Sequence, residues 1–255
     1  MKISIIGAGA MGGTTAEGLL KQRHVSVELT VSDPNADTRQ RMAALGATVT
    51  ADNRLAASEQ DVVMVVVKPW LVCQVLEGIR EALNTSRILI VVAAGVSSAS
   101  VREASGRNHF FLAIPNIAIA QLASMTFVVP VQCSGTETQQ VLQLFNAVGQ
   151  TLITDEQHLP AGTTLASCGL AYALRYIRAA SEGGVELGFR ADDAKDIVAQ
   201  TVEGAVRLLK TTGMHPEQAI DMVTTPGGVT IKGLNEMEHA GFTSAVIRGL
   251  KAGVS

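Results

Sequence analysis

Residues 2–12 read KISIIGAGAMG, where a short apolar segment is followed at once by three glycines in the pattern G-x-G-x-x-G. The apolar segment predicts a strand, and the residues that follow it, up to Lys21, predict a helix. A glycine turn in this context favours dinucleotide binding, because Gly7 permits the tight turn and Gly9 lets a pyrophosphate approach the backbone. Gly12 would let the helix pack closely on the sheet. The alternative is a glycine turn with a structural role only.

The rest of the chain shows two patterns of predicted secondary structure, one with strands and helices and one with helices alone. Further strands are predicted at 26–31, 61–67, 87–92, 109–114 and 126–131, alternating with helical patterns. This alternation predicts an α/β fold, a Rossmann-type doubly wound sheet that is mostly parallel and covered by helices on both faces. Beyond it, Ala- and Leu-rich stretches predict helices at about 160–187 and 191–211. We therefore predict a dinucleotide-binding domain at 1–157 and an all-helical domain at 158–255.

The predicted helix over 166–187 is apolar around much of its circumference, with small residues at several positions. A helix of this kind is difficult to cover within a domain of about 100 residues. We therefore expect a second subunit to cover it.

Composition excludes several classes of function. The chain has 255 residues, 47% of them apolar and 17% charged, and a formal net charge of −3. A negative chain without a basic run is unsuited to nucleic acid. We find no apolar run of membrane-spanning length and no cleavable leader, and so expect a cytoplasmic protein. Cys73, Cys133 and Cys168 lack metal-ligand spacing, which indicates free structural thiols and no metal.

Two features bear on the cofactor. Asp33 ends the second predicted strand, where a carboxylate suits the free 2′-hydroxyl of NAD and repels a 2′-phosphate. Ser32 and Asn35 offer other polar groups, and Arg39 lies one or two turns further on. NADH versus NADPH therefore stays open, with Asp33 favouring NADH. Lys68-Pro69 and Ala94-Gly95-Val96 directly follow two other strands, at the edge where ligands bind, although Lys68 alone is also compatible with a solvated strand end.

A second glycine-rich stretch, VTTPGGVTI at residues 223–231, lies between two helical patterns. Paired glycines let a ligand approach the backbone, and successive N–H groups leading into the next helix could hold a small carboxylate. An ordinary Pro-Gly-Gly turn between helices is the alternative.

Taken in order along the chain, these residues resemble pyrroline-5-carboxylate reductases, the NAD(P)H-dependent enzymes that make proline. The stretch at 224–230 resembles the signature loop of that family. The N-terminal motifs are Gly7–Gly12, Asp52-Asn53, Val67-Lys68-Pro69, Ala94-Gly95-Val96 and Pro115-Asn116. The C-terminal motifs are Gly169 with Ala171-Tyr172, Leu187-Gly188, Ala199-Gln200-Thr201, and His215-Pro216 through Thr230.

The resemblance implies that a hydride passes from the nicotinamide to the carbon of the C=N bond of 1-pyrroline-5-carboxylate, giving L-proline. It implies that Thr225 and the N–H groups of Gly228 and Val229 hold the substrate carboxylate, with Gly227 in the same loop. Thr230 is expected to contribute its N–H to this site and to bind the ring nitrogen through its hydroxyl, as the catalytic residue. The expected cofactor-binding residues are Gly7, Gly9, Ala10, Met11, Gly12, Asp33, Asn53, Val67, Lys68, Pro69, Ala94 and Asn116. The family pairs subunits through interlocked C-terminal helices, which implies a homodimer or an oligomer built from dimers.

The chain departs from the family pattern in three places. An Arg-x-Met-Pro-Asn-Thr-Pro stretch is replaced by residues 112–118, LAIPNIA, and a Ser-Gly-Ser-Gly-Pro stretch by residues 166–170, ASCGL. Trp70, the only tryptophan, stands where a smaller polar residue is common, either as packing or as part of the cofactor pocket. Another cyclic imino acid and a non-catalytic cofactor-binding homologue therefore stay open. A β-hydroxyacid dehydrogenase would need a lysine on the first long helix, and 162–188 contains none.

Overall fold

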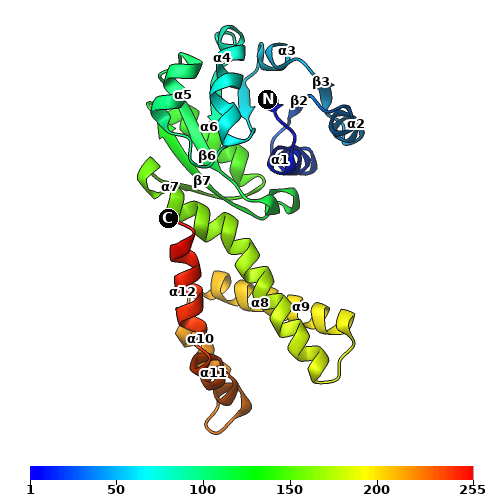
Figure 1. The fold of residues 1–255 in the computed structure, drawn as a ribbon, viewed down its shortest axis with the longest axis vertical. Helices are drawn as coiled ribbons and strands as arrows, with labels where there is room; N and C mark the ends of the chain where they lie inside the picture. Colours follow the sequence, from blue (N-terminus) through cyan, green and yellow to red (C-terminus); the bar gives the residue numbers. More distant parts are fainter. Residues whose placement is uncertain (255) are drawn as a thin grey trace. The chain divides into compact units, whose positions relative to one another are not determined.

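The computed structural model describes residues 1–254, which divide into two compact units, Met1–Ser167 (unit 1) and Cys168–Ser255 (unit 2). Unit 1 is built on one eight-stranded sheet in the order β3-β2-β1-β4-β5-β6-β7-β8 (Figure 1). Its strands are β1 (Lys2–Ile6), β2 (Glu28–Ser32), β3 (Thr48–Thr50), β4 (Val62–Val65), β5 (Ile88–Val91), β6 (Phe110–Ile114), β7 (Ser124–Val131) and β8 (Gly149–Ile153). The predicted mostly parallel sheet is confirmed, whereas the sequence pattern misses both edge strands, β3 and β8. β3 has only three residues, two of them threonines.

One neighbouring pair departs from the parallel arrangement. β6 and β7 run antiparallel, with Leu112 opposite Val129, and β7 then pairs in parallel with β8. The connection between β6 and β7, residues 115–123, is shorter than the dozen or more residues that a parallel crossover requires. The direction of β7 therefore follows from the length of this connection.

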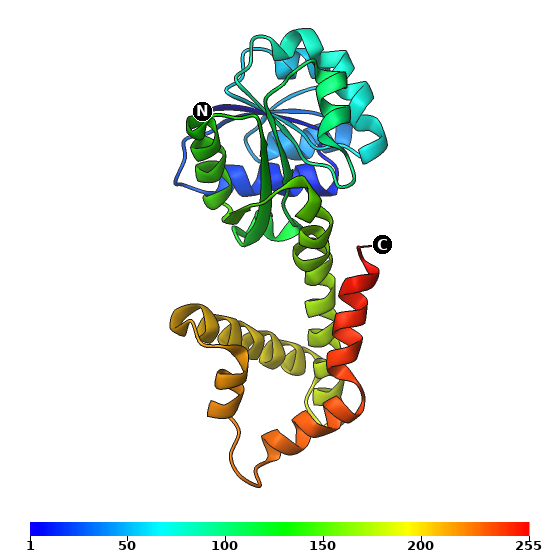
Figure 2. The ribbon, with the colours of Figure 1, turned by 90° about the vertical axis from the view of Figure 1, so that its left-hand side faces the viewer.

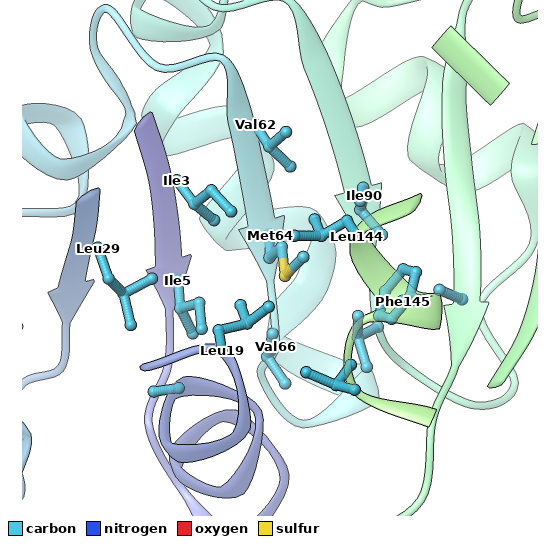
Figure 3. Packing of buried hydrophobic residues seen from close by; sticks show 14 of the residues in the cluster. Ile3, Ile5, Leu19, Leu29, Val62, Met64, Val66, Ile90, Leu144 and Phe145 are labelled. Atoms are coloured by element: carbon cyan, nitrogen blue, oxygen red, sulfur yellow. The ribbon is translucent and has the colours of Figure 1, made fainter. Parts of the chain in front are cut away.

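Helices cover both faces of the sheet, as predicted. They are α1 (Ala10–Lys21), α2 (Ala36–Ala44), α3 (Asn53–Ala57), α4 (Val72–Leu83), α5 (Ser98–Ser105), α6 (Gly135–Asn146) and α7 (Leu159–Gly162). One buried cluster joins α1, α2 and α6 to alternate strand residues such as Ile3 and Met64, and its side chains interlock in Figure 3. A second cluster joins α3, α4 and α5 to the other strand face, for example Val63 and Val65. Because β4 and β5 are buried on both faces, their sequences are continuously apolar rather than alternating.

The described residues of unit 2, 168–254, form helices joined by turns and contain no strand, as predicted. Unit 2 contains α8 (Gly169–Glu186), α9 (Ala191–Thr212), α10 (Pro216–Met222), α11 (Val229–His239) and α12 (Phe242–Ala252), and α9 contacts α8 at a large angle to it (Figure 2). Ala194 is the one residue that is buried among those described in this unit. Large apolar side chains such as Leu174 and Val246 are exposed by 58% and 43%. The apolar surface of these helices is therefore not covered within the chain.

The two units part ten residues after the domain boundary that we predict at 157/158, since unit 1 ends at Ser167. Leu159 belongs to the second buried cluster of the sheet, and Gly162 lies against the ring of Phe127. A π-helical segment follows, η4 (Thr163–Cys168), where we predict a continuous helix. Its carbonyl at Ala166 accepts a hydrogen bond from the Asn116 Nδ2 at 3.2 Å. These contacts attach the start of the predicted helical domain to the sheet.

Candidate active site

The glycine turn joins β1 to α1 with the geometry that dinucleotide binding requires. Gly7 has φ +93°, and a Cβ there would lie 2.5 Å from the Val66 carbonyl oxygen. A Cβ on Gly12 would overlap the carbonyl oxygen of Gly7, whereas a Cβ on Gly9 would meet no atom within 4 Å. Gly7 and Gly12 are thus required by the fold, and the space above Gly9 is open to a ligand.

The N-terminus of α1 lies at this open side. Gly9 is the N-cap residue, no side chain caps the helix, and no acidic residue occupies its first turn. The N–H groups of Ala10, Met11 and Gly12 begin a 12-residue helix. Unsatisfied N–H groups and the helix dipole favour an anion at such a position. The residues present therefore fit a dinucleotide pyrophosphate.

Asp33 is brought to the same turn, but in an unexpected orientation. Its Oδ2 accepts a hydrogen bond from the Ala8 N–H at 2.8 Å, and its Oδ1 accepts one from the Asn35 N–H at 2.8 Å. The residue is only 9% exposed. Both carboxylate oxygens are thus directed at the protein backbone, and Asp33 holds the glycine turn to the end of β2.

β4, β5 and β6 end at the same edge of the sheet as β1 and β2. These five strands are neighbours and run parallel, so their carboxyl ends lie together. Val67-Lys68-Pro69 follows β4, and Ala94 follows β5 and is exposed. Asn53, at the start of α3, accepts a hydrogen bond on Oδ1 from the Ser32 hydroxyl at 2.7 Å, so its amide N–H₂ remains available. The structure therefore assembles the predicted cofactor residues along one edge.

Asn116 is the exception among them. It is 5% exposed, its Oδ1 accepts the Ala118 N–H at 3.1 Å, and its Nδ2 donates to the Ala166 carbonyl. Its backbone N–H donates to the Ser124 hydroxyl. Asn116 thus stabilises the turn after β6 through three hydrogen bonds. Only one hydrogen of its side-chain amide remains free to bind the cofactor directly. No local sequence signal identifies Ser124 or Ala166 as its partners.

Two positions near this turn that depart from the family pattern differ in their exposure to solvent. Leu112 is 2% exposed and packs in the second buried cluster, whereas Ile117 is 54% exposed. Leu112, which stands where the family pattern has an arginine, therefore contributes an apolar side chain to the core. Ile117 leaves an apolar side chain at the turn that follows β6.

Trp70 belongs to the short 3₁₀ turn η1 (Pro69–Leu71) that follows β4, and it is 75% exposed. Trp70 therefore does not pack in the core of unit 1. An exposed tryptophan at the ligand edge of the sheet is an unusual use of apolar surface.

We expect NADH or NADPH to quench the fluorescence of Trp70, because the dihydronicotinamide absorbs in the range of tryptophan emission and the predicted cofactor residues lie at the same edge. Trp70 is the only tryptophan, so the signal has a single source. A titration of emission against cofactor measures the effect, and Trp70→Phe removes it while calorimetry still detects binding. Unchanged emission at saturating cofactor would place Trp70 away from it.

In unit 2, the predicted carboxylate loop is a tight turn that leads directly into α11. Gly227 has φ +71°, and the Gly228 N–H donates to the Thr225 carbonyl oxygen at 2.9 Å. Gly228 is the N-cap of α11, which no side chain caps and whose first turn has no acidic residue. A Cβ on Gly228 would lie 2.5 Å from the Thr225 Oγ1, so this hydroxyl lies over the start of the helix.

This geometry corrects one predicted contact. The Gly228 N–H is already used by Thr225, so it is not free for a substrate carboxylate. The N–H groups of Val229, Thr230 and Ile231, at the first positions of α11, have no acceptor among the described residues. The hydroxyls of Thr225 and Thr230 likewise make no hydrogen bond within residues 1–254, whereas the Thr224 hydroxyl donates to the Ile220 carbonyl.

The remaining titratable groups form no further catalytic constellation in the described part of the chain. Burial, followed by the charge of Glu137, raises the pKa of the Cys133 thiol to about 11, and its Sγ donates to the Phe110 carbonyl. This fits the predicted structural thiol. Residues 1–254 contain no group of three or more His, Cys, Asp or Glu side chains arranged to hold a metal ion. Over the same residues, the structure has no helix both long and apolar enough to cross a membrane.

Comparison with known proteins agrees with both halves of this description. Residues 156–255 match the family model described as pyrroline-5-carboxylate reductase dimerisation. Residues 2–95 match the model described as NADP oxidoreductase, coenzyme F420-dependent.

Individual relatives extend the likeness over the whole chain. Pyrroline-5-carboxylate reductase 1 of Dictyostelium discoideum is 35% identical over 262 residues, covering 97% of this chain but only 48% of that longer protein. Pyrroline-5-carboxylate reductase 2 of the same organism is 34% identical and is covered over 89% of its length, with 97% of this chain. The crystal structure of 1-pyrroline-5-carboxylate reductase from Streptococcus pyogenes has a TM-score of 0.88 and 28% identity, covering 100% of this chain and 96% of that one.

Proposed function

Since this chain belongs to the pyrroline-5-carboxylate reductase family, we propose that it reduces the C=N bond of 1-pyrroline-5-carboxylate to proline, in proline biosynthesis. It is an NAD(P)H-dependent oxidoreductase with a Rossmann-type unit and a helical dimerisation unit. Bound NAD(P)H supplies the hydride. The protein's own residues bind and orient the two reactants and hold a proton at the substrate nitrogen.

The loop in front of α11 supports the substrate assignment. Its free N–H groups, at Val229, Thr230 and Ile231, begin an 11-residue helix and point the positive end of the helix dipole at the space before it. Gly228 adds no side chain there, and the Thr225 hydroxyl lies beside it. A small carboxylate is the ligand that such an arrangement favours. This is the observation that carries the proposal.

Thr230 is the residue that we place at the reacting nitrogen. Its hydroxyl has no acceptor or donor within residues 1–254, whereas the hydroxyls of Thr201 and Thr212 in α9 donate to the carbonyls four residues earlier. An unpaired hydroxyl in the same first turn as the carboxylate site can hydrogen-bond the ring nitrogen as it becomes an amine. A protonated imine already accepts hydride readily, so orientation of the two reactants would supply most of the rate enhancement.

Homo-oligomerisation follows from the dimerisation family model over residues 156–255. We propose that the unit is a homodimer formed by the helices of unit 2. The exposed apolar side chains of α8 and α12, including Leu174 and Val246, support this assignment, because a second copy would remove them from water.

The proposal is tested by the oxidation of NADH and of NADPH by the purified protein, with 1-pyrroline-5-carboxylate or a six-membered cyclic imino acid as the acceptor. We expect turnover with the five-membered ring. Turnover only with the six-membered ring would assign the altered residues 112–118 and 166–170 to a change of substrate. A protein that binds cofactor but turns over neither ring would contradict the proposed function.

A further inference from the structure

The turn after β2 is the position that distinguishes NADH from NADPH in this class of fold. In the structure, the Asp33 carboxylate at this turn faces the protein backbone. The negative charge at Asp33 is bound by two backbone N–H groups and is nearly buried. A carboxylate in that orientation has few free lone pairs to offer a 2′-hydroxyl. The hydrogen-bonding part of the sequence argument for NADH therefore loses its basis.

The side chain of Arg39 lies at the same turn. Its Nη1 donates to the carbonyl oxygens of Asp33 at 2.7 Å and of Pro34 at 2.9 Å. The guanidinium is thereby fixed beside the two residues that border the adenosine ribose in this class of fold. Fixing it in the free protein removes part of the entropy cost of ordering a long side chain on binding.

The other edge of the Arg39 guanidinium is free. Neither its Nε nor its Nη2 makes a hydrogen bond or ion pair anywhere in residues 1–254. These two groups form a fork that matches two oxygens of a phosphate. Arg41, from the same helix, adds positive charge nearby, with its Nη2 3.4 Å from the carbonyl oxygen of Ala8 in the glycine turn.

We propose that Arg39 binds the ribose 2′-phosphate of NADPH and makes NADPH the preferred cofactor, while Asp33 acts as a positioning residue for the glycine turn. This inference rests on the proposed use of NAD(P)H. It concerns only the adenosine half of the cofactor, so binding measurements test it without any imine reduction.

The test measures dissociation constants by calorimetry for 2′,5′-ADP and 5′-AMP, and for NADPH and NADH, with the wild type and with Arg39→Met. We expect the wild type to bind 2′,5′-ADP more tightly than 5′-AMP. Arg39→Met should weaken 2′,5′-ADP and NADPH about 10- to 100-fold, the value of a charge-assisted hydrogen-bonded pair, and leave 5′-AMP and NADH nearly unchanged. Arg39→Lys, which keeps the charge but loses the fork, should lie between the two.

Two further variants separate recognition from folding. Arg80→Met removes an exposed arginine in the last turn of α4 and should leave the dissociation constants of all four ligands unchanged. Asp33→Asn should weaken the binding of both NADH and NADPH, because it loosens the glycine turn. Equal losses of NADH and NADPH in Arg39→Met, or no loss of either, would overturn the inference. A protein that binds 2′,5′-ADP through Arg39 yet reduces no imine would disprove the proposed function and leave this inference intact.

Discussion

A Thr230→Val variant is expected to lose about 100-fold in kcat while its affinity for NAD(P)H stays that of the wild type. Valine keeps the β-branched shape of threonine, so α11 retains its first turn, but the hydroxyl that we place at the substrate nitrogen is absent. Steady-state kinetics with 1-pyrroline-5-carboxylate gives kcat and KM, and calorimetry with the cofactor gives its dissociation constant. KM should change little, because the N–H groups of the loop still hold the carboxylate.

A matched control separates this effect from a general loss of a threonine hydroxyl. The Thr212 hydroxyl in unit 2 donates to the Leu208 carbonyl near the end of α9. Thr212→Val removes the same atoms from a helix end with no proposed ligand, so its kcat should match the wild type. Normal turnover in Thr230→Val would remove this hydroxyl from the mechanism, and an increase in KM alone would move it to substrate binding.

The second large effect is expected in Gly12→Ala. The added Cβ would overlap the carbonyl oxygen of Gly7, a backbone atom that cannot move without opening the β1–α1 turn. We expect the free energy of unfolding of the cofactor-free protein to fall by about 2 kcal/mol or more, as in other overpacked sites. Cofactor affinity should fall at least about 100-fold, because the turn no longer presents its N–H groups together.

Gly9→Ala provides the contrast, because both glycines belong to one motif but serve it differently. A Cβ on Gly9 meets no protein atom within 4 Å, so the cofactor-free variant should unfold at the same denaturant concentration as the wild type. Its cofactor affinity should nevertheless fall, since the methyl group occupies the open space above the turn. If Gly12→Ala were as stable as the wild type, the close packing of α1 on Gly7 would not be a constraint on this fold.

Local constraints explain which features could be predicted from the sequence. The roles of Gly7 and Gly12 depend on backbone contacts within a few residues, so a short motif is sufficient to identify them. The direction of β7 was also available, in the length of the connection at 115–123. In contrast, the contact between Asp33 and the Ala8 N–H depends on the register that places Ser32 beside Ile6.

Long-range side-chain contacts account for the other differences. Asn116 reaches a carbonyl 50 residues further along the chain, and its partner lies in a π-helical segment that periodicity does not distinguish from an ordinary helix. The resemblance predicts that the Gly228 N–H binds the substrate, because the sequence does not show how the loop is folded. The turn conformation set by Gly227 instead pairs that N–H with Thr225.

Unit 2 buries a single described residue, Ala194, and this makes its stability a matter of mass action. Helices without a core of their own are marginal in water, so their order depends on how often two copies meet. Dilution would therefore lower helicity and specific activity together, and the melting temperature would rise with protein concentration. A cell that makes too little of this protein would lose activity more steeply than in proportion to the number of copies.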